Sequence, residues 1–330
     1  MKECDIDARE AVKLVRDKGI VEPCFKKHCT SFLFTTENQE GISKVIDYKG
    51  KDVLTVAASG DQYISSVYYG AGNVDIFDIN KFSYYITCLK VASLVSLDYE
   101  TFVGFLIPVH NEGIEKSFWN LRTLKKVIKN MPTDVAYFWD LVMYECKKHG
   151  FDGNFVIPNH RNSTKCNVIK GMPFYSSPEE YYKLQSLLKK REYPKYYEVD
   201  LLELSSVVTD SYDVIYLSNI VECLVSSEMR MYYGFTPGYN SENMVEERYI
   251  FDIARQVMPR LRENGEILYS YRPNSSKEYS TDVLYRNDYF DVTEVDCKYP
   301  PSSDYNKTYD TDLVLTYKPS KSGNILDCLK

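Results

Sequence analysis

The stretch that most constrains this fold is residues 51–80, which pass from a strand pattern through a helix pattern to a second strand pattern. Residues 53–58 are β-formers and small apolar residues, typical of a strand covered on both faces. A Ser-Gly-Asp turn at 59–61 interrupts this run before a short helix. The second buried strand, 74–77, ends on Asp78. A small-residue turn followed about 20 residues later by an acid at a strand end predicts a nucleoside site in an open α/β sheet.

The composition is that of a globular protein. The chain has 330 residues, of which 44% are hydrophobic and 26% charged, so it can bury a substantial core. No apolar run approaches the roughly 18 residues of a transmembrane helix, and the N-terminus is too polar for a signal peptide. Nine cysteines without a CxxC pair indicate reduced thiols, so we expect a cytoplasmic protein. The net charge of −7 argues against a broad nucleic-acid surface.

A long insertion is predicted after the second strand. Residues 81–97 favour a helix, and the next convincing parallel strand begins only at Tyr196. A plain crossover between parallel strands needs far fewer residues than this gap supplies. Helices are expected in the insertion at 114–130, 133–150 and 177–191. Because loops over a rigid α/β frame commonly contact substrate, the insertion is the predicted acceptor cap.

Elsewhere the sequence predicts helices near the N-terminus and a return of the α/β order after the insertion. Apolar spacing favours N-terminal helices at 7–18 and 41–48. The later elements are expected to be strands at 196–201, 212–217 and 266–271, a helix from 241 or 242 to 258, and a turn at 261–265. No helix pattern separates 289–296 from 312–317, so these two strands are expected to pair antiparallel.

Five segments, in this order, resemble the motifs of class I S-adenosylmethionine-dependent methyltransferases. They are VLTVAASGD at 53–61, FDIN at 77–80, EVDLLEL at 198–204, YDVIYLSNIVECL at 212–224 and MPRLRENGEILYSY at 258–271. The resemblance implies a Rossmann-like α/β fold: a seven-stranded, mostly parallel sheet with an antiparallel last hairpin and an inserted helical cap. It also implies S-adenosyl-L-methionine as cofactor and a transferase activity, with methyl transfer the common reaction of the fold.

The resemblance divides the chain into parts. An N-terminal helical or lid segment is expected at 1–50. The S-adenosylmethionine-binding core is expected at 51–100 and 195–320, and the helical cap at 101–194. The acceptor is expected to be a small molecule or a lipid; the sequence leaves its identity and the oligomeric state open.

A narrower resemblance is carried by FLFTTENQE at 32–40 and LKVASLVSLDYETF at 89–102. Both are similar to the family that includes bacterial betaine-lipid enzymes, which transfer the 3-amino-3-carboxypropyl group of S-adenosylmethionine to diacylglycerol. The chain departs from that family at 36–38, where Thr-Glu-Asn replaces a tryptophan-containing stretch. Aminocarboxypropyl transfer therefore stands beside methyl transfer as an expected reaction.

The class I resemblance implies roles for individual residues. Ser59, Gly60 and Asp61 would line the methionine end of the cofactor, Asp78 would bind the ribose hydroxyls, and Asp200 would accept a hydrogen bond from the adenine amino group. The full set of implied cofactor-binding residues is Ala57, Ser59, Gly60, Asp61, Asp78, Ile79, Asn80, Asp200, Leu201, Ser218 and Asn219. Ser218 and Asn219 would face the reacting centre, and Glu222, just beyond Asn219, is a candidate for proton removal, so Asn219 and Glu222 are the expected catalytic residues.

Each role has a structural alternative. Asp78 or Asn219 can cap a following helix, Asp200 can be a surface acid, and Gly60 can serve turn geometry alone. Tyr63 or Tyr216 can face the sulfonium or belong to the core. The histidines of the insertion, at 110, 149 and 160, are further candidates for proton removal.

Other site classes are disfavoured. The turn has one glycine, whereas dinucleotide-binding turns commonly show GxGxxG, so an NAD-dependent oxidoreductase is the weaker alternative. Cys24, His28 and Cys29 lack the second half of a zinc site, and no metal is predicted. A binding protein that keeps the fold without turnover remains open. Basic runs at 125–129 and 189–191 are either solvated helix faces or contacts for anionic lipid or RNA, so peripheral membrane contact is also open.

Overall fold

The computed structural model describes residues 3–16, 27–28, 33–35, 37–107, 109–111, 114–116, 121–149, 171–218, 220, 253–271, 290–298 and 311–319. Their contacts divide the chain into two compact units. The first unit comprises residues 1–36, 57–68 and 78–198. The second comprises residues 37–56, 69–77 and 199–330. These two units do not test the expected division into an N-terminal lid, a cofactor-binding core and a helical cap, which stays a prediction.

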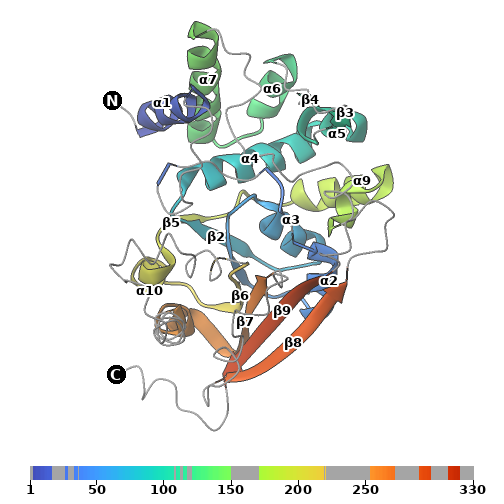
Figure 1. Cartoon of the computed structure of the whole chain (residues 1–330), viewed down its shortest axis with the longest axis vertical. Helices are drawn as coiled ribbons and strands as arrows, with labels where there is room; N and C mark the ends of the chain where they lie inside the picture. Colours follow the sequence, from blue (N-terminus) through green and yellow to red (C-terminus); the bar gives the residue numbers. More distant parts are fainter. Residues whose placement is uncertain are drawn as a thin grey trace. The chain divides into compact units, whose positions relative to one another are not determined.

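The second unit is built on a sheet whose strands pair in the order β2-β1-β6-β7-β9-β8 (Figure 1). These strands are β1 (Val53–Val56), β2 (Val74–Asp78), β6 (Tyr212–Tyr216), β7 (Leu261–Tyr271), β8 (Phe290–Lys298) and β9 (Thr311–Pro319). The last residue of β2, Asp78, is counted in the first unit. All four residues of β1 are buried, as its apolar composition requires of a central strand.

The pairing of these strands confirms an α/β fold with a parallel sheet. The pairs β1–β2, β1–β6 and β6–β7 are parallel, with Val53 opposite both Val74 and Val214. The pairs β7–β9 and β8–β9 are antiparallel, so the expected antiparallel end of the sheet is present. The predicted seven strands are not all found within this unit, because β5 (Tyr196–Glu198) belongs to the first unit.

The turn predicted at 261–265 falls within the bounds of β7, which runs from Leu261 to Tyr271. The pairing of β7 with β6 passes from Leu261 directly to Glu266 with a shift of register, and its pairing with β9 begins at Ile267. Asn264 has a φ of 66°, and a Cβ atom on Gly265 would lie 2.8 Å from Leu261 Cγ. The chain therefore bends back at the Asn-Gly pair, before the paired part of the strand.

The remaining described elements of the second unit are short. Helix α2 (Gln39–Val45) begins two residues before the predicted helix, because the Asn38 side chain caps it by accepting from the Gly41 N–H. It packs against β8 and β9. The others are η2 (Leu201–Glu203), α10 (Leu204–Val207) and η3 (Met258–Arg260). Of the helix predicted at 242–258, residues 253–257 are helical, and 242–252 lie outside the described residues.

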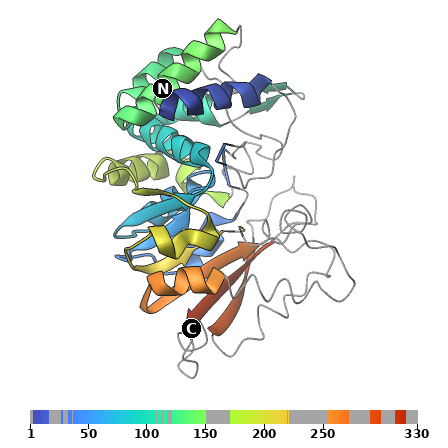
Figure 2. The same cartoon turned by 90° about the vertical axis from the view of Figure 1, so that its left-hand side faces the viewer.

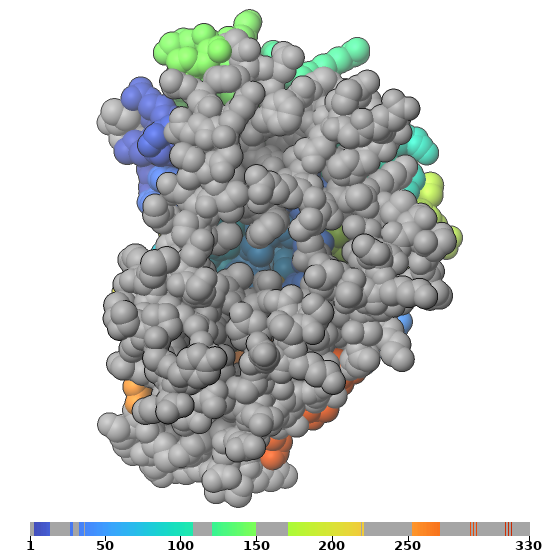
Figure 3. Space-filling view, viewed as in Figure 1, coloured from blue at the N-terminus to red at the C-terminus, as the bar shows by residue number. Residues whose placement is uncertain are grey.

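The first unit is mainly helical. Its helices are α1 (Glu3–Arg16), α3 (Asp61–Tyr68), α4 (Lys81–Ser96), α5 (Tyr99–Leu106), α6 (Leu121–Ile128), α7 (Thr133–Lys148), η1 (Pro173–Tyr175) and α9 (Pro178–Leu188). Most of α4 is buried, and α3, α6 and α9 pack against it. Helix α1 lies beside α7 (Figures 2 and 3). Helices were expected at most of these places, and Ser177 caps α9 as its sequence indicates.

The insertion contains one wrong helix prediction. The helix expected at 114–130 is instead a strand followed by a shorter helix. Strand β4 (Ile114–Lys116) pairs antiparallel with β3 (Val109–Asn111), and α6 begins only at Leu121. Among the described residues, no helix is long and apolar enough to cross a membrane.

Candidate functional site

The turn after β1 has the strained backbone of a close-approach loop. Ala58 and Gly60 have φ values of 43° and 83°, a region that side chains disfavour. A Cβ atom on Gly60 would lie 2.8 Å from Thr87 Oγ1, on α4. Glycine is therefore required at position 60 both by the backbone angle and by the approach of α4. Ala57 is fully buried beneath this turn.

Asp78 links this turn to the end of β2. Its Oδ2 atom accepts a hydrogen bond from the Ala58 N–H at 3.0 Å, and its Oδ1 atom accepts from the Asn80 N–H at 2.8 Å. The side chain that caps α4 is that of Asn80, which accepts from the Phe82 N–H, so Asp78 is not the helix cap. The Ser83 side chain also hydrogen-bonds to the Asp78 carboxylate. A carboxylate offers about four lone-pair positions, so Asp78 keeps acceptor capacity for a ligand.

Burial raises the pKa of Asp78 to about 6, although the N–H groups of Asn80 and Ala58 lower it in part. A carboxylate with a raised pKa at the end of a parallel strand is typical of a functional position. Ile79, the next residue, is half-buried.

Asp61 is a fully buried acid with four partners. Its Oδ1 atom accepts from Lys90 Nζ at 2.6 Å and from the Tyr175 hydroxyl at 3.2 Å. Its Oδ2 atom accepts from the Thr35 N–H at 2.7 Å and the Ser59 hydroxyl at 3.0 Å. Both Asp61 and Ser59 are thus engaged in holding the turn.

Lys90 is completely buried beside Asp61. Burial lowers the pKa of Lys90 to about 8, against the opposing effect of the Asp61 charge. Its ammonium group also lies 4.2 Å from the centre of the Phe34 ring. Residues 34 and 35, from the segment expected to act as a lid, are therefore fixed against the turn by this buried ion pair.

In the second unit, Glu37 is a buried carboxylate that sequence reasoning missed. Its Oε1 atom accepts from the Ser218 hydroxyl at 2.6 Å and from the Ser270 hydroxyl. Its Oε2 atom accepts from the Tyr216 hydroxyl at 2.9 Å and from Gln39 Nε2 at 3.3 Å. Ser218 has a φ of 56°, so the end of β6 is also strained. Glu37 ties the chain before α2 to the carboxyl ends of β6 and β7.

The other predicted residues of the second unit have local roles. Asp200 caps η2 by accepting from the Leu202 N–H at 2.9 Å, and Leu201 is buried. Asn219 and Glu222 lie outside the described residues. Tyr216 is engaged with Glu37, which accounts for its burial without a ligand.

The alternative candidates for proton removal and metal binding gain no support. His110 lies in β3, His149 is partly exposed beside Glu145, and 160 lies outside the described residues. Tyr63, in the first unit, is a buried core residue. In the described part of the chain, no group of three or more metal-ligating side chains converges.

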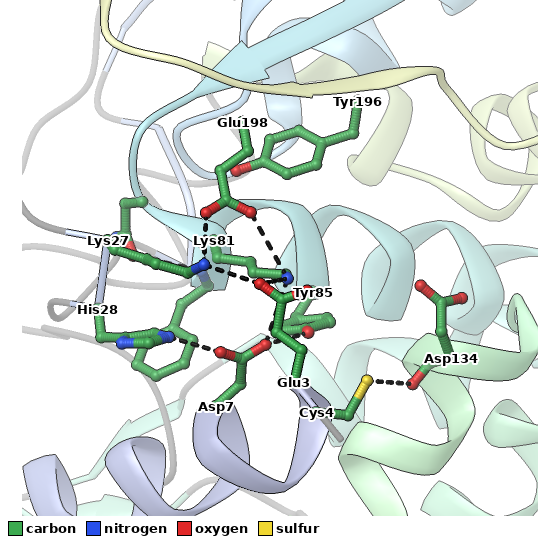
Figure 4. A network of polar contacts seen from close by, with 12 residues as sticks. Glu3, Cys4, Asp7, Lys27, His28, Lys81, Tyr85, Asp134, Tyr196 and Glu198 are labelled. Atoms are coloured by element: carbon green, nitrogen blue, oxygen red, sulfur yellow. Dashed lines mark hydrogen bonds and ion pairs between the residues drawn. The ribbon is translucent and has the colours of Figure 1, made fainter. Parts of the chain in front are cut away.

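A second network, also missed from the sequence, surrounds Asp7 of α1 (Figure 4). Asp7 is fully buried and accepts from His28 Nε2 and from the Tyr85 hydroxyl, each at 2.6 Å. Lys81 Nζ lies 3.5 Å from Asp7 and 3.0 Å from Glu3. These contacts attach α1 to the N-terminal turn of α4.

Comparisons with known proteins give structural likeness only. No family model matches the chain, and no curated protein matches it. Among solved structures, the N-methyltransferase NodS of Bradyrhizobium japonicum WM9 shows 7% identity and a TM-score of 0.36, covering 86% of this chain and 94% of NodS. The rRNA methyltransferase AviRa of Streptomyces viridochromogenes shows 9% identity and a TM-score of 0.41, covering 98% and 95%.

TrmN of Thermus thermophilus shows 8% identity and a TM-score of 0.34, and this chain spans only 48% of it. At these identities and TM-scores, the likeness carries no argument about the chemistry of this chain.

Proposed function

We propose that this chain is an S-adenosylmethionine-dependent transferase on a class I methyltransferase-like core. The observation that carries the proposal is the position of Asp78. It is a carboxylate of raised pKa that ends a parallel strand, accepts the Ala58 N–H of a positive-φ turn and keeps acceptor capacity beside its bonds to Ala58, Asn80 and Ser83. A carboxylate acceptor at this place suits the hydroxyls of a ribose, so the residues present fit a nucleoside cofactor.

The roles proposed for the chain's residues are to bind and to position. Asp78 would hold the ribose, and the turn at Gly60 would let backbone approach the methionine end. The bound cofactor supplies an electrophilic carbon on its sulfonium. The rate then depends on how closely the protein aligns that carbon with the acceptor nucleophile. The other cofactor-binding residues implied by the resemblance, the catalytic roles of Asn219 and Glu222, the seven-stranded sheet, the helical cap and a cytoplasmic location stay parts of this proposal.

Aminocarboxypropyl transfer is the second candidate reaction, and one contact favours it. Phe34 and Lys90 come from the two segments that resemble the betaine-lipid enzymes, and they meet around Asp61. Methyl transfer is the alternative that the general fold favours. A small-molecule or lipid acceptor is proposed for either reaction.

The test is to incubate the protein with S-adenosylmethionine and pools of small-molecule and lipid acceptors and to identify the spent cofactor by mass spectrometry. Methyl transfer releases S-adenosylhomocysteine, whereas aminocarboxypropyl transfer releases methylthioadenosine. Asp78→Ala should abolish both. Cofactor binding without any consumption would favour a non-catalytic binding protein, and absence of binding at millimolar cofactor would overturn the proposal.

A further inference from the structure

Two basic runs that are distant in the sequence belong to the same helical unit. The first comprises Lys125, Lys126 and Lys129, on and just after α6, and all three are exposed. The second comprises Lys189 and Lys190, both exposed, and Arg191, which is half-exposed, at the end of α9. Neither run contributes to the site around Asp78 and Asp61.

Packing on α4 brings the ends of these runs together. Helices α6 and α9 both pack against α4, and Figure 1 shows them on either side of it. The Tyr193 hydroxyl donates to the carbonyl of Asn130, the residue that follows Lys129. Asn130 Nδ2 in turn donates to Ser96 Oγ on α4 at 2.8 Å. Asn130, directly after the first basic run, is thus hydrogen-bonded to Tyr193, which lies two residues beyond the second run.

The resulting surface, formed by residues 121–129 and 189–191, is basic in a chain whose net charge is −7. Arg122, also exposed, adds a further cation on α6. Fewer acidic than basic residues lie near this surface. Asp98 lies close enough to Lys126 for that charge to help lower the pKa of Asp98, after the larger effect of the Thr101 hydrogen bonds. Glu192 is the acid next to the second run.

The same surface exposes apolar area. Leu121 is 46% exposed and lies four residues before Lys125, so the two side chains share one face of α6. The buried side of α6 is formed by Thr123, Leu124 and Val127, which leaves the cations and Leu121 on the outer side. Lysines on an outward face attract anionic lipid, and an exposed leucine beside them can add apolar contact.

We propose that the surface formed by α6 and the end of α9 docks on a bilayer rich in anionic phospholipid. Lysines near such a surface each strengthen binding by roughly five-fold, and an exposed leucine adds apolar contact with the headgroup region. RNA is the alternative partner for a basic surface. Binding of RNA phosphates, however, would gain no free energy from contact with the exposed Leu121. The proposal stands independently of the transferase activity, because it uses no residue of the cofactor site.

The test is co-sedimentation of the full-length protein with vesicles of phosphatidylcholine, with or without about one third phosphatidylserine. Binding is expected only with phosphatidylserine and is expected to fall steeply as salt is raised. The variants Lys125→Gln/Lys126→Gln and Lys189→Gln/Lys190→Gln should each lose at least roughly ten-fold in affinity. Leu121→Ser should weaken binding without changing its salt dependence.

The matched control is Lys44→Gln/Lys49→Gln, which removes two exposed lysines from the second unit and should bind like wild type. The salt titration of wild-type protein needs no variant and so does not depend on how the variants fold. Equal losses in the cluster and control variants would overturn the proposal. So would absence of binding to phosphatidylserine vesicles, or tighter binding to single-stranded RNA than to vesicles at the same ionic strength.

Discussion

Asp78 is the residue whose ionisation should control cofactor binding. Because its pKa is raised to about 6, it is ionised above that pH and carries a proton below it. The ionised carboxylate only accepts hydrogen bonds, whereas protonation removes an acceptor position, so affinity for S-adenosylmethionine should be full near pH 7.5 and fall as the pH drops below 6. Calorimetric titrations between pH 5 and 8 measure this.

Asp78→Asn is the comparison for that titration. It keeps the shape of the side chain but does not titrate, so its weakened binding should not change between pH 5 and 7. A wild-type affinity that stays constant over this range would show that Asp78 does not contact the ribose.

Gly60 allows a test of the turn geometry. Its φ is 83°, and a Cβ atom added there would lie 2.8 Å from Thr87 Oγ1, so Gly60→Ala should destabilise the protein by about 2 kcal/mol or more. Gly104 is the matched control, because it lies in α5 and a Cβ atom there would meet nothing within 4 Å. Gly104→Ala should be neutral or slightly stabilising. Urea denaturation compares the two, and equal stabilities would contradict the argument.

At the scale of elements, Glu37 holds the segment before α2 to the ends of β6 and β7. Glu37→Gln replaces an acceptor oxygen with an NH₂ group that faces hydroxyl donors. The free energy of unfolding should therefore fall by about 1–3 kcal/mol. Glu40→Gln, on α2, removes only a surface ion pair with Lys44 and should cost less than about 0.5 kcal/mol. Urea melts of both variants make the comparison; a Glu37 variant as stable as wild type would mean that the carboxylate is not required.

The attachment of α1 should depend on pH through Asp7. Burial alone would raise its pKa, but the hydrogen bonds of His28 and Tyr85 and the charge of Lys81 together lower it below 3.8. A lowered folded-state pKa gives stability that is present above the unfolded value and is lost as the pH falls through the folded value. Amide exchange in α1 should therefore accelerate below about pH 4, before the rest of the first unit opens.

Asp7→Asn should produce that acceleration already at pH 7, because Lys81 and His28 would lose a buried charged partner. Glu10→Gln, on the same helix, removes only a surface contact with Lys13 and should leave the exchange unchanged. Uniform exchange across α1 and α4 in both variants would argue against this attachment.

At the scale of the whole molecule, the sequence predicts those parts of the structure that depend on residues close together in the chain. The strand, turn and acid from β1 to Asp78 and the N-cap of α9 are local patterns, and the structure has the predicted elements there. Glu37 was missed because its hydroxyl partners lie 179 to 233 residues away. The turn preference of Asn264 and Gly265 is also local, and the chain bends there within the bounds of β7, where the register with β6 shifts.

Ligand binding should be visible in the stability of the whole chain. A ligand that binds only the folded state stabilises it by about 2.7 kcal/mol at one hundred times its dissociation constant, which raises the melting temperature of a chain this size by a few degrees. S-adenosylmethionine should produce that shift in wild-type protein and none in Asp78→Ala, since the acid that would hold the ribose is gone. NAD should produce no shift, because the turn has one glycine where a pyrophosphate would need closer backbone approach. A shift with NAD alone would instead favour an oxidoreductase, and equal shifts in wild type and Asp78→Ala would locate the ligand elsewhere.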